Sequence, residues 1–179
     1  MHRHFEEELE ELKDRMLYMG SLVERAVHLS IDALTQRDER LASEVIAEIE
    51  PQINEMHLEL DDRALRLLAL QQPMAVDLRF ITSTIKINSD LERMGDQAVN
   101  IAQRAISILS SPQLRPQVDV PRMAELTEKM VKDSLDSFVR RDNELARDVI
   151  LRDDEIDQYR DMVFRELIAQ MIKSPNCIQ

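Results

Sequence analysis

The sequence predicts an all-α protein, and three observations favour that fold class. Hydrophobic residues make up 44% of the 179 positions and charged residues 32%, whereas aromatic residues make up 3% and only two glycines occur. This composition is rich in helix formers and lacks the β-branched and aromatic runs, separated by glycine turns, that strands require. Apolar residues recur every three or four positions, which is the period of an amphipathic helix. Finally, the helical pattern occurs twice along the chain.

The apolar period predicts three long helices in the first part of the chain. The first spans about 5–36. The second spans about 38–70; Asp38 is its expected N-cap, and Pro51 is expected to kink it because proline removes a backbone hydrogen bond. The third spans about 73–109, with a proline in its first turn. Short connections make consecutive helices antiparallel, so we expect an elongated three-helix bundle.

An internal repeat follows the third helix. Residues 19–46 align without gaps with residues 123–150 and are identical at 12 of 28 positions. Any two amphipathic helices match partly at apolar positions, but these segments also share a Ser-x-Asp sequence and an Arg-Asp corner between two helices. We therefore interpret the repeat as a duplication.

The duplication predicts two units of unequal size. Residues 1–111 form a complete three-helix bundle, residues 112–119 a proline-containing linker, and residues 120–179 an incomplete bundle with helices at 120–140 and 143–173. The counterpart of the third helix would lie beyond the last residue, so the second unit should expose an apolar groove. The alternatives are a truncated chain or a helix supplied by another chain, and we expect truncation.

Charge, hydropathy and cysteine content limit the molecules that this protein can bind and the compartment in which it is expected. The net charge is −12, from 35 acidic and 23 basic residues, so the basic patch needed to bind nucleic acid is missing. No segment approaches the roughly 20 apolar residues that span a bilayer, and the acidic N-terminus does not resemble a signal peptide. The single cysteine, Cys177, excludes an intramolecular disulfide framework. We expect a cytoplasmic protein with no membrane insertion and no nucleic-acid partner.

The third helix carries the residues with the clearest chemical potential. Glu92, Asp96 and Asn100 are spaced four apart and form a stripe that faces away from the expected core. One interpretation is a solvated acidic face; the other is a site for a hard cation, whose oxygen ligands lie one helical turn apart. Gly95, which is costly inside a helix, indicates a close approach there. The predicted core stripe of this helix is Phe80, Ile87, Leu91, Met94, Ala98, Ile101, Ala105 and Ile108.

Three segments carry a resemblance to a known family. They are HFEEEL at 4–9, ALQQPMAVDLRF at 69–80 and DLERMGDQAVNI at 90–101. Together with the duplicated helices, they resemble the PhoU family of bacterial regulators of phosphate uptake over the whole chain.

The resemblance implies two pseudo-symmetric three-helix bundles, each with an acidic metal motif on its third helix. Here the motif falls on Glu92 and Asp96, with Asn100 as its extension, and the ion would be divalent or trivalent, with iron or zinc possible. The second motif would lie on the missing helix, and Gln97 stands where relatives commonly have histidine.

The resemblance further implies a non-enzymatic negative regulator of phosphate uptake and phosphate-starvation signalling. Such a regulator contacts the phosphate ABC transporter and its sensor histidine kinase. A homodimer is also expected, because the incomplete bundle would expose apolar surface.

Two other classes of protein stay open as alternatives. A metal-handling, iron-binding bundle would place Glu and Glu-x-x-His ligands inward between facing helices, but here the acids face outward and no such motif occurs. A structural coiled-coil spacer would not use the acidic stripe, so replacing Glu92 and Asp96 with alanine would leave metal content and signalling unchanged. His28 and His57 lack a histidine four residues away and are interpreted as surface residues.

Overall fold

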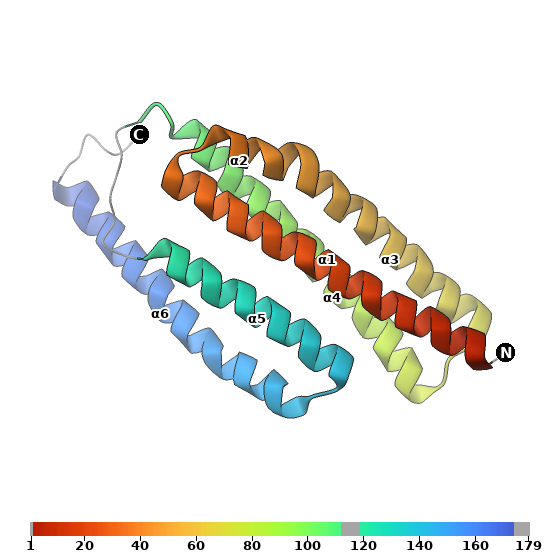
Figure 1. The fold of residues 1–179 in the computed structure, drawn as a ribbon. Helices are drawn as coiled ribbons and strands as arrows, with labels where there is room; N and C mark the ends of the chain where they lie inside the picture. The colour runs from red at the N-terminus through yellow and green to blue at the C-terminus, as the bar shows by residue number, and fades with distance from the viewer. Residues whose placement is uncertain (1, 112–118, 174–179) are drawn as a thin grey trace.

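The computed structural model describes residues 2–111 and 119–173, and it is built from five helical rods (Figure 1). Residues 112–118, which hold most of the predicted linker, and Cys177 lie outside the described residues. The rods confirm the all-α prediction. They are α1 (His2–Gln36), a continuous rod made of α2 (Glu39–Glu44), the π-helix η1 (Val45–Ile49) and α3 (Glu50–Gln71), then α4 (Ala75–Ser107), α5 (Val120–Arg140) and α6 (Asn143–Lys173).

The second rod has an N-cap at its start and a proline directly after its π-helix. Asp38 is the N-cap, as predicted, and accepts a hydrogen bond of 2.8 Å from the Arg40 backbone N–H. The Arg40 guanidinium also hydrogen-bonds this carboxylate and lowers the pKa of Asp38. Pro51 lies in the first turn of α3, directly after the π-helix. The wider π turn accommodates a proline, which has no N–H and whose ring would clash with a carbonyl one turn earlier.

The corner between α3 and α4 differs from the prediction. Helix α4 begins at Ala75 rather than at Pro73, and it ends at Ser107 rather than near Leu109. The chain turns sharply here because Gln72 and Ala75 both have positive φ, 45° and 27°. Alanine rarely adopts such a backbone conformation, so the corner holds local strain.

The core of the first unit lies between α1, α3 and α4. The buried positions of α4 differ from the predicted stripe: Ile87, Met94 and Ile101 are only half-buried and Ile108 is exposed. The buried residues of α4 keep heptad spacing, but alternate positions lie one residue later than predicted: Asn88, Gly95 and Ala102 are buried in place of Ile87, Met94 and Ile101. Small and polar residues carry no apolar signal, so the sequence pattern did not indicate these core positions. The residues that α4 buries are Phe80, Ile81, Thr84, Asn88, Leu91, Gly95, Ala98, Ala102 and Ala105.

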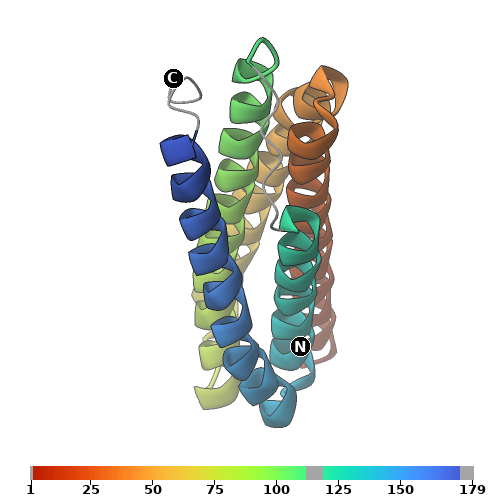
Figure 2. The same ribbon diagram turned by 90° about the vertical axis from the view of Figure 1, so that its left-hand side faces the viewer.

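The second unit has two described helices. Helix α5 packs against α1 and α6, whereas α6 packs against α5 alone. Figure 2 views the molecule from the side of α6, whose outer face no described helix covers. In the described residues, the second unit thus has two helical rods where the first has three.

The contact between the units joins equivalent residues of the repeat. Glu24 and His28 on α1 correspond to Glu128 and Lys132 on α5 at the offset of 104 residues. His28 Nδ1 lies 3.4 Å from Glu128 Oε1, and Lys132 acts on Glu24 by charge attraction. Burial at the contact raises the pKa of both glutamates above the ordinary value of 4.5. An approximate two-fold axis between α1 and α5 therefore relates the two repeats.

The π-helix marks the point at which the two repeats lose register. The gapless alignment ends at Ile46 and Ile150, and the π-helix spans Val45–Ile49. A π turn adds one residue to a helix. Beyond it, the buried Ile53 of α3 corresponds to the half-buried Ile156 of α6 at an offset of 103.

Candidate functional site

The predicted stripe on α4 lies on the outside of the first unit. Asp96 and Asn100 are exposed and Glu92 is half-buried, so the predicted outward orientation is correct. The three oxygen-bearing side chains follow one another along a single helix at four-residue spacing. Two neighbours, Asp90 and Arg93, form an ion pair of 3.6 Å beside the stripe.

Gly95 serves helix packing rather than access by a ligand. A Cβ at this position would lie 3.0 Å from Ile53 Cδ1 and 3.2 Å from Cγ2 of the same residue. The side chain of Ile53, which is 1% exposed, therefore occupies the space that the glycine leaves. The close approach inferred from the sequence is real, but its partner is α3.

The donor set of the stripe fits part of a metal shell. Carboxylate and amide oxygens are ligands for hard cations and for iron or zinc. In residues 2–111 and 119–173, however, no group of three or more His, Cys, Asp or Glu side chains converges on one point. Glu92, Asp96 and Asn100 could hold an ion on one side, and the remaining ligands would be water, an anion or another molecule.

An apolar groove runs beside the stripe, between α1, α4 and α5. Its volume is about 480 Å³. Asp90, Arg93 and Gln97 give its α4 wall a polar edge. Because Met94 and Ile101 line this groove, their half-burial has a structural reason. The apolar lining is Val27, Ile31, Met94, Ala98, Ile101, Val120, Met123 and Ala124.

A second apolar surface lies at the α3–α4 corner, within the segment 69–80 that carries the family resemblance. Leu70 is 74% exposed and Met74 is 80% exposed. Val76 and Leu78 in the first turn of α4 are also exposed. Exposed apolar residues gathered in one place are typical of a surface that contacts another protein.

Two polar residues important to the fold were missed by the sequence analysis. The Arg37 guanidinium lies 2.7 Å from the carbonyl oxygens of Ile108 and Leu109, just beyond α4. The repeated Arg-Asp corner was the available signal for this residue. Asn88 is fully buried, and its amide donates to the His57 carbonyl and the Asp61 carboxylate at 2.9 and 2.8 Å. No sequence signal indicated Asn88.

His28 and His57 both lie near acidic side chains. His28 is 59% exposed and approaches Asp32 at 3.9 Å in addition to Glu128. His57 Nε2 lies 3.9 Å from Asp61, beside the buried Asn88. Neither histidine lies in a cluster of metal-binding side chains within the described segments.

Comparison with known proteins identifies a family and relatives whose sequences are similar to this chain. The family model described as PhoU domain matches residues 16–105 and 120–179. A phosphate-specific transport system accessory protein PhoU homolog of Aquifex aeolicus is 41% identical over 172 residues, which are 96% of this chain and 77% of that protein. The homolog of Pseudomonas aeruginosa is 39% identical over 97% of this chain and 72% of its own length.

Solved structures have the same fold. The crystal structure of PhoU from Pseudomonas aeruginosa superposes with a TM-score of 0.90 over 97% of this chain and 83% of that one, at 39% identity. The phosphate transport system regulatory protein PhoU from Streptococcus pneumoniae gives a TM-score of 0.86 at 31% identity and covers 95% of this chain and 80% of that one.

Within residues 2–111 and 119–173, no helix is long and apolar enough to cross a bilayer.

Proposed function

Because the chain belongs to the PhoU family of phosphate transport accessory proteins, which are not enzymes, we propose that it is a negative regulator of phosphate uptake and phosphate-starvation signalling. It acts in the cytoplasm by contacting the phosphate ABC transporter and the sensor histidine kinase, and it forms a homodimer. The observation that best supports a contact role is the exposed apolar corner formed by the family-like segment 69–80.

Complementation tests this role. In a bacterium whose own PhoU-family gene is deleted, the chain should restore low phosphate uptake and a silent phosphate-starvation promoter in phosphate-rich medium. Replacing Leu70 and Met74 with serine should abolish this repression without loss of helix content, because both side chains are exposed. The control replaces Leu58 and Leu65, which are 69% and 59% exposed elsewhere on α3, with serine. Constitutive promoter activity with the unchanged chain would exclude the regulatory role.

We further propose that Glu92, Asp96 and Asn100 hold a divalent or trivalent metal ion, iron or zinc being the candidates. Two carboxylates one turn apart repel each other, and a shared cation removes that repulsion. Bound metal would also give α4 a positively charged site at which an anion or an acidic partner could complete the shell.

Metal analysis of the purified protein tests this site. The Glu92→Gln, Asp96→Asn double variant should lose at least about tenfold in affinity for ferric iron or zinc, because each change removes a charged ligand. The matched control, Glu55→Gln with Asp62→Asn, alters two acids on α3, of which Glu55 is exposed and Asp62 is 58% exposed. Equal metal content in both variants would support the solvated-face interpretation. Rapid turnover of ferrous iron would instead support the iron-handling alternative.

A further inference from the structure

The two units of the chain meet chiefly through α1 and α5, which pack side by side. Near the end of α5, Phe138 stacks on Phe80 of α4, with ring centroids 4.9 Å apart. The side chain of Leu135, which is 5% exposed, fills the space that Gly20 leaves on α1. This apolar part of the contact is therefore closely packed.

The charged part of the contact lies one to two turns away from Gly20 and Leu135. Carboxylates outnumber cations in it, because five acids face one lysine and one histidine. Lysine is charged throughout the physiological pH range, whereas histidine changes charge within it. We call these seven residues the charged seam; they are Glu24, His28 and Asp32 on α1, and Glu125, Glu128, Lys132 and Asp136 on α5.

The internal repeat places two equivalent ion pairs in the charged seam, and they differ in one residue. Glu24 of α1 is attracted by Lys132 of α5, and Glu128 of α5 is attracted by His28 of α1. His28 and Lys132 occupy the same position of the two repeats. One pair therefore has a permanent cation, and the other has a cation only when its histidine is protonated.

The pair with the histidine holds a buried oxygen that lacks a hydrogen bond. Glu128 Oε1 lies 3.4 Å from His28 Nδ1 without the alignment of a hydrogen bond, and it has no such partner within the described residues. His28 Nε2 also lies 3.9 Å from Asp32 Oδ2. An imidazolium at His28 attracts both carboxylates, whereas a neutral imidazole does not. A proton on His28 therefore strengthens the attraction between α1 and α5.

The two equivalent glutamates respond to protons in the same direction. Burial is the main reason why the pKa of both Glu24 and Glu128 is raised above the ordinary value of 4.5, and repulsion between them adds to it. Attraction by Lys132 and His28 lowers each pKa, but the net direction is upward. A carboxyl group with a raised pKa binds its proton more tightly in the contact than in separated units. The contact therefore gains stability as pH falls through the raised pKa values towards 4.5, and it loses this stability as pH rises.

We propose that the contact between α1 and α5 is a pH-sensitive switch, which tightens as protons bind to the charged seam and loosens as they leave. Protonation of His28 adds a cation beside Glu128, and protonation of either glutamate removes repulsion across the contact. The position of the second unit on the first thus depends on acidity. This switch goes beyond the proposed function, because it uses no residue of the candidate metal stripe or of the apolar corner.

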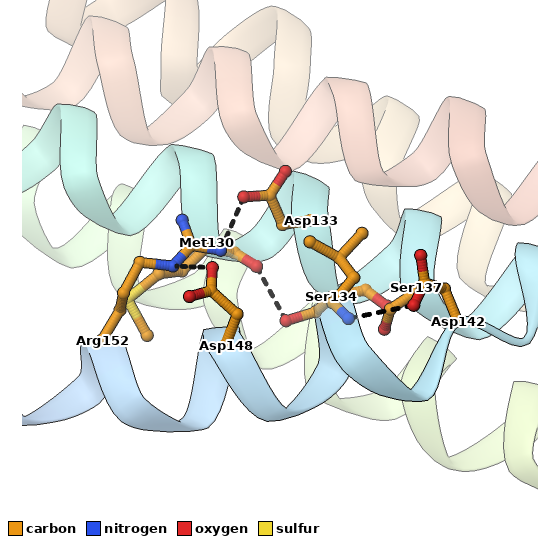
Figure 3. A network of polar contacts seen from close by, with 8 residues as sticks. Met130, Asp133, Ser134, Ser137, Asp142, Asp148 and Arg152 are labelled. Carbon is orange, nitrogen blue, oxygen red and sulfur yellow. Dashed lines mark hydrogen bonds and ion pairs between the residues drawn. The ribbon is translucent and has the colours of Figure 1, made fainter.

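The opposite contact of α5, which it makes with α6, is built with a permanent cation (Figure 3). The Arg152 guanidinium on α6 hydrogen-bonds the Asp133 carboxylate on α5 at 2.6 Å and lies 3.1 Å from the Asp148 carboxylate. Arginine stays protonated at every physiological pH. The pairing of α5 with α6 is therefore expected to be insensitive to the protons that act on the charged seam.

Amide hydrogen exchange of residues 120–140 tests the switch, because undocking from α1 removes packing that protects α5. After correction for the chemical exchange rate, exchange should rise about three- to tenfold between about pH 5.5 and about pH 8, since each proton taken up allows up to tenfold per pH unit. Glu24→Gln with Glu128→Gln should remove most of this rise, because both replacements are neutral and similar in size. The control, Glu55→Gln with Glu144→Gln, changes one exposed glutamate in each unit and should leave the rise unchanged.

His28→Lys gives a second readout that leaves both glutamates in place. It makes the two equivalent ion pairs alike, so α5 should be protected at about pH 8 as the unchanged chain is at about pH 5.5. An equal rise in exchange in the Glu24, Glu128 variant and in the control variant would overturn the proposal. Exchange at high pH that His28→Lys does not slow would also overturn it.

Urea unfolding extends the test to the case in which α5 exchanges only when the whole chain unfolds. The unfolding free energy then falls as pH rises, and the Glu24, Glu128 variant should show a smaller slope than the control variant. Equal slopes in the two variants would overturn the proposal.

Discussion

Replacing Ile53 with alanine is expected to lower the free energy of unfolding by about 2–5 kcal/mol. Ile53 is 1% exposed and lies against Gly95, which has no side chain that could move into the space. The cavity therefore stays open, and the loss should lie toward the upper part of that range. Urea unfolding followed by circular dichroism measures it. Asn54→Ala, on the exposed face one residue away, should cost less than about 1 kcal/mol.

The contact between Ile53 and Gly95 also predicts that the effect of Gly95→Ala on stability depends on whether Ile53 is present. Gly95→Ala alone places a Cβ 3.0 Å from Ile53, and this crowding offsets the gain in helix propensity. In the Ile53→Ala background the crowding is gone. There Gly95→Ala should stabilise the protein by about 1 kcal/mol, the helical preference for alanine over glycine. Additive effects of the two changes would contradict the packing described for this site.

Replacing Arg37 with alanine is expected to cost about 1.5–3 kcal/mol, the usual value for hydrogen bonds made by a charged group. The guanidinium holds three carbonyls at 2.7–2.8 Å where α4 ends, and alanine would leave them without this donor. Amide hydrogen exchange should show the effect at the end of α4, where the protection of Ile108 should fall most.

A nearby arginine provides the control for Arg37. Arg40 is 90% exposed, and its ion pair with Asp38 is a surface contact. Such contacts contribute about 0–1 kcal/mol, so Arg40→Ala should change stability little. If both arginine variants lost the same stability, general charge rather than the carbonyl contacts of Arg37 would be responsible.

The sequence predicted the helices well because each depends on local pattern. The apolar period and the cap at Asp38 placed the rods and the corner after α1. The bounds of α4 were less accurate, since positive φ at Gln72 and Ala75 reflects how the corner is folded back rather than the residues alone. The buried stripe of α4 was wrong at Ile87, because the next residue, the polar Asn88, takes the buried position and gives no apolar signal.

The candidate metal site was likewise predictable only in the part that depends on local sequence. Its outward direction follows from spacing within one helix, so the exposure of Asp96 and Asn100 was predictable. A complete metal shell depends on distances between different helices or molecules, which no periodicity encodes. Gly95 illustrates the point: the sequence indicated a close approach, and only the packing of Ile53 identified its partner.

Helix α6, which has one neighbour among the described helices, is expected to unfold before the rest of the molecule. Local unfolding costs least where a segment has few buried contacts. Helix α6 buries no side chain and, among the described helices, touches only α5, whereas α1 is held by α3, α4 and α5. Separation of α6 would therefore leave the core around Ile53 intact. The protein is expected to lose structure in stages from its C-terminal hairpin inward, with the first unit as the part that persists longest.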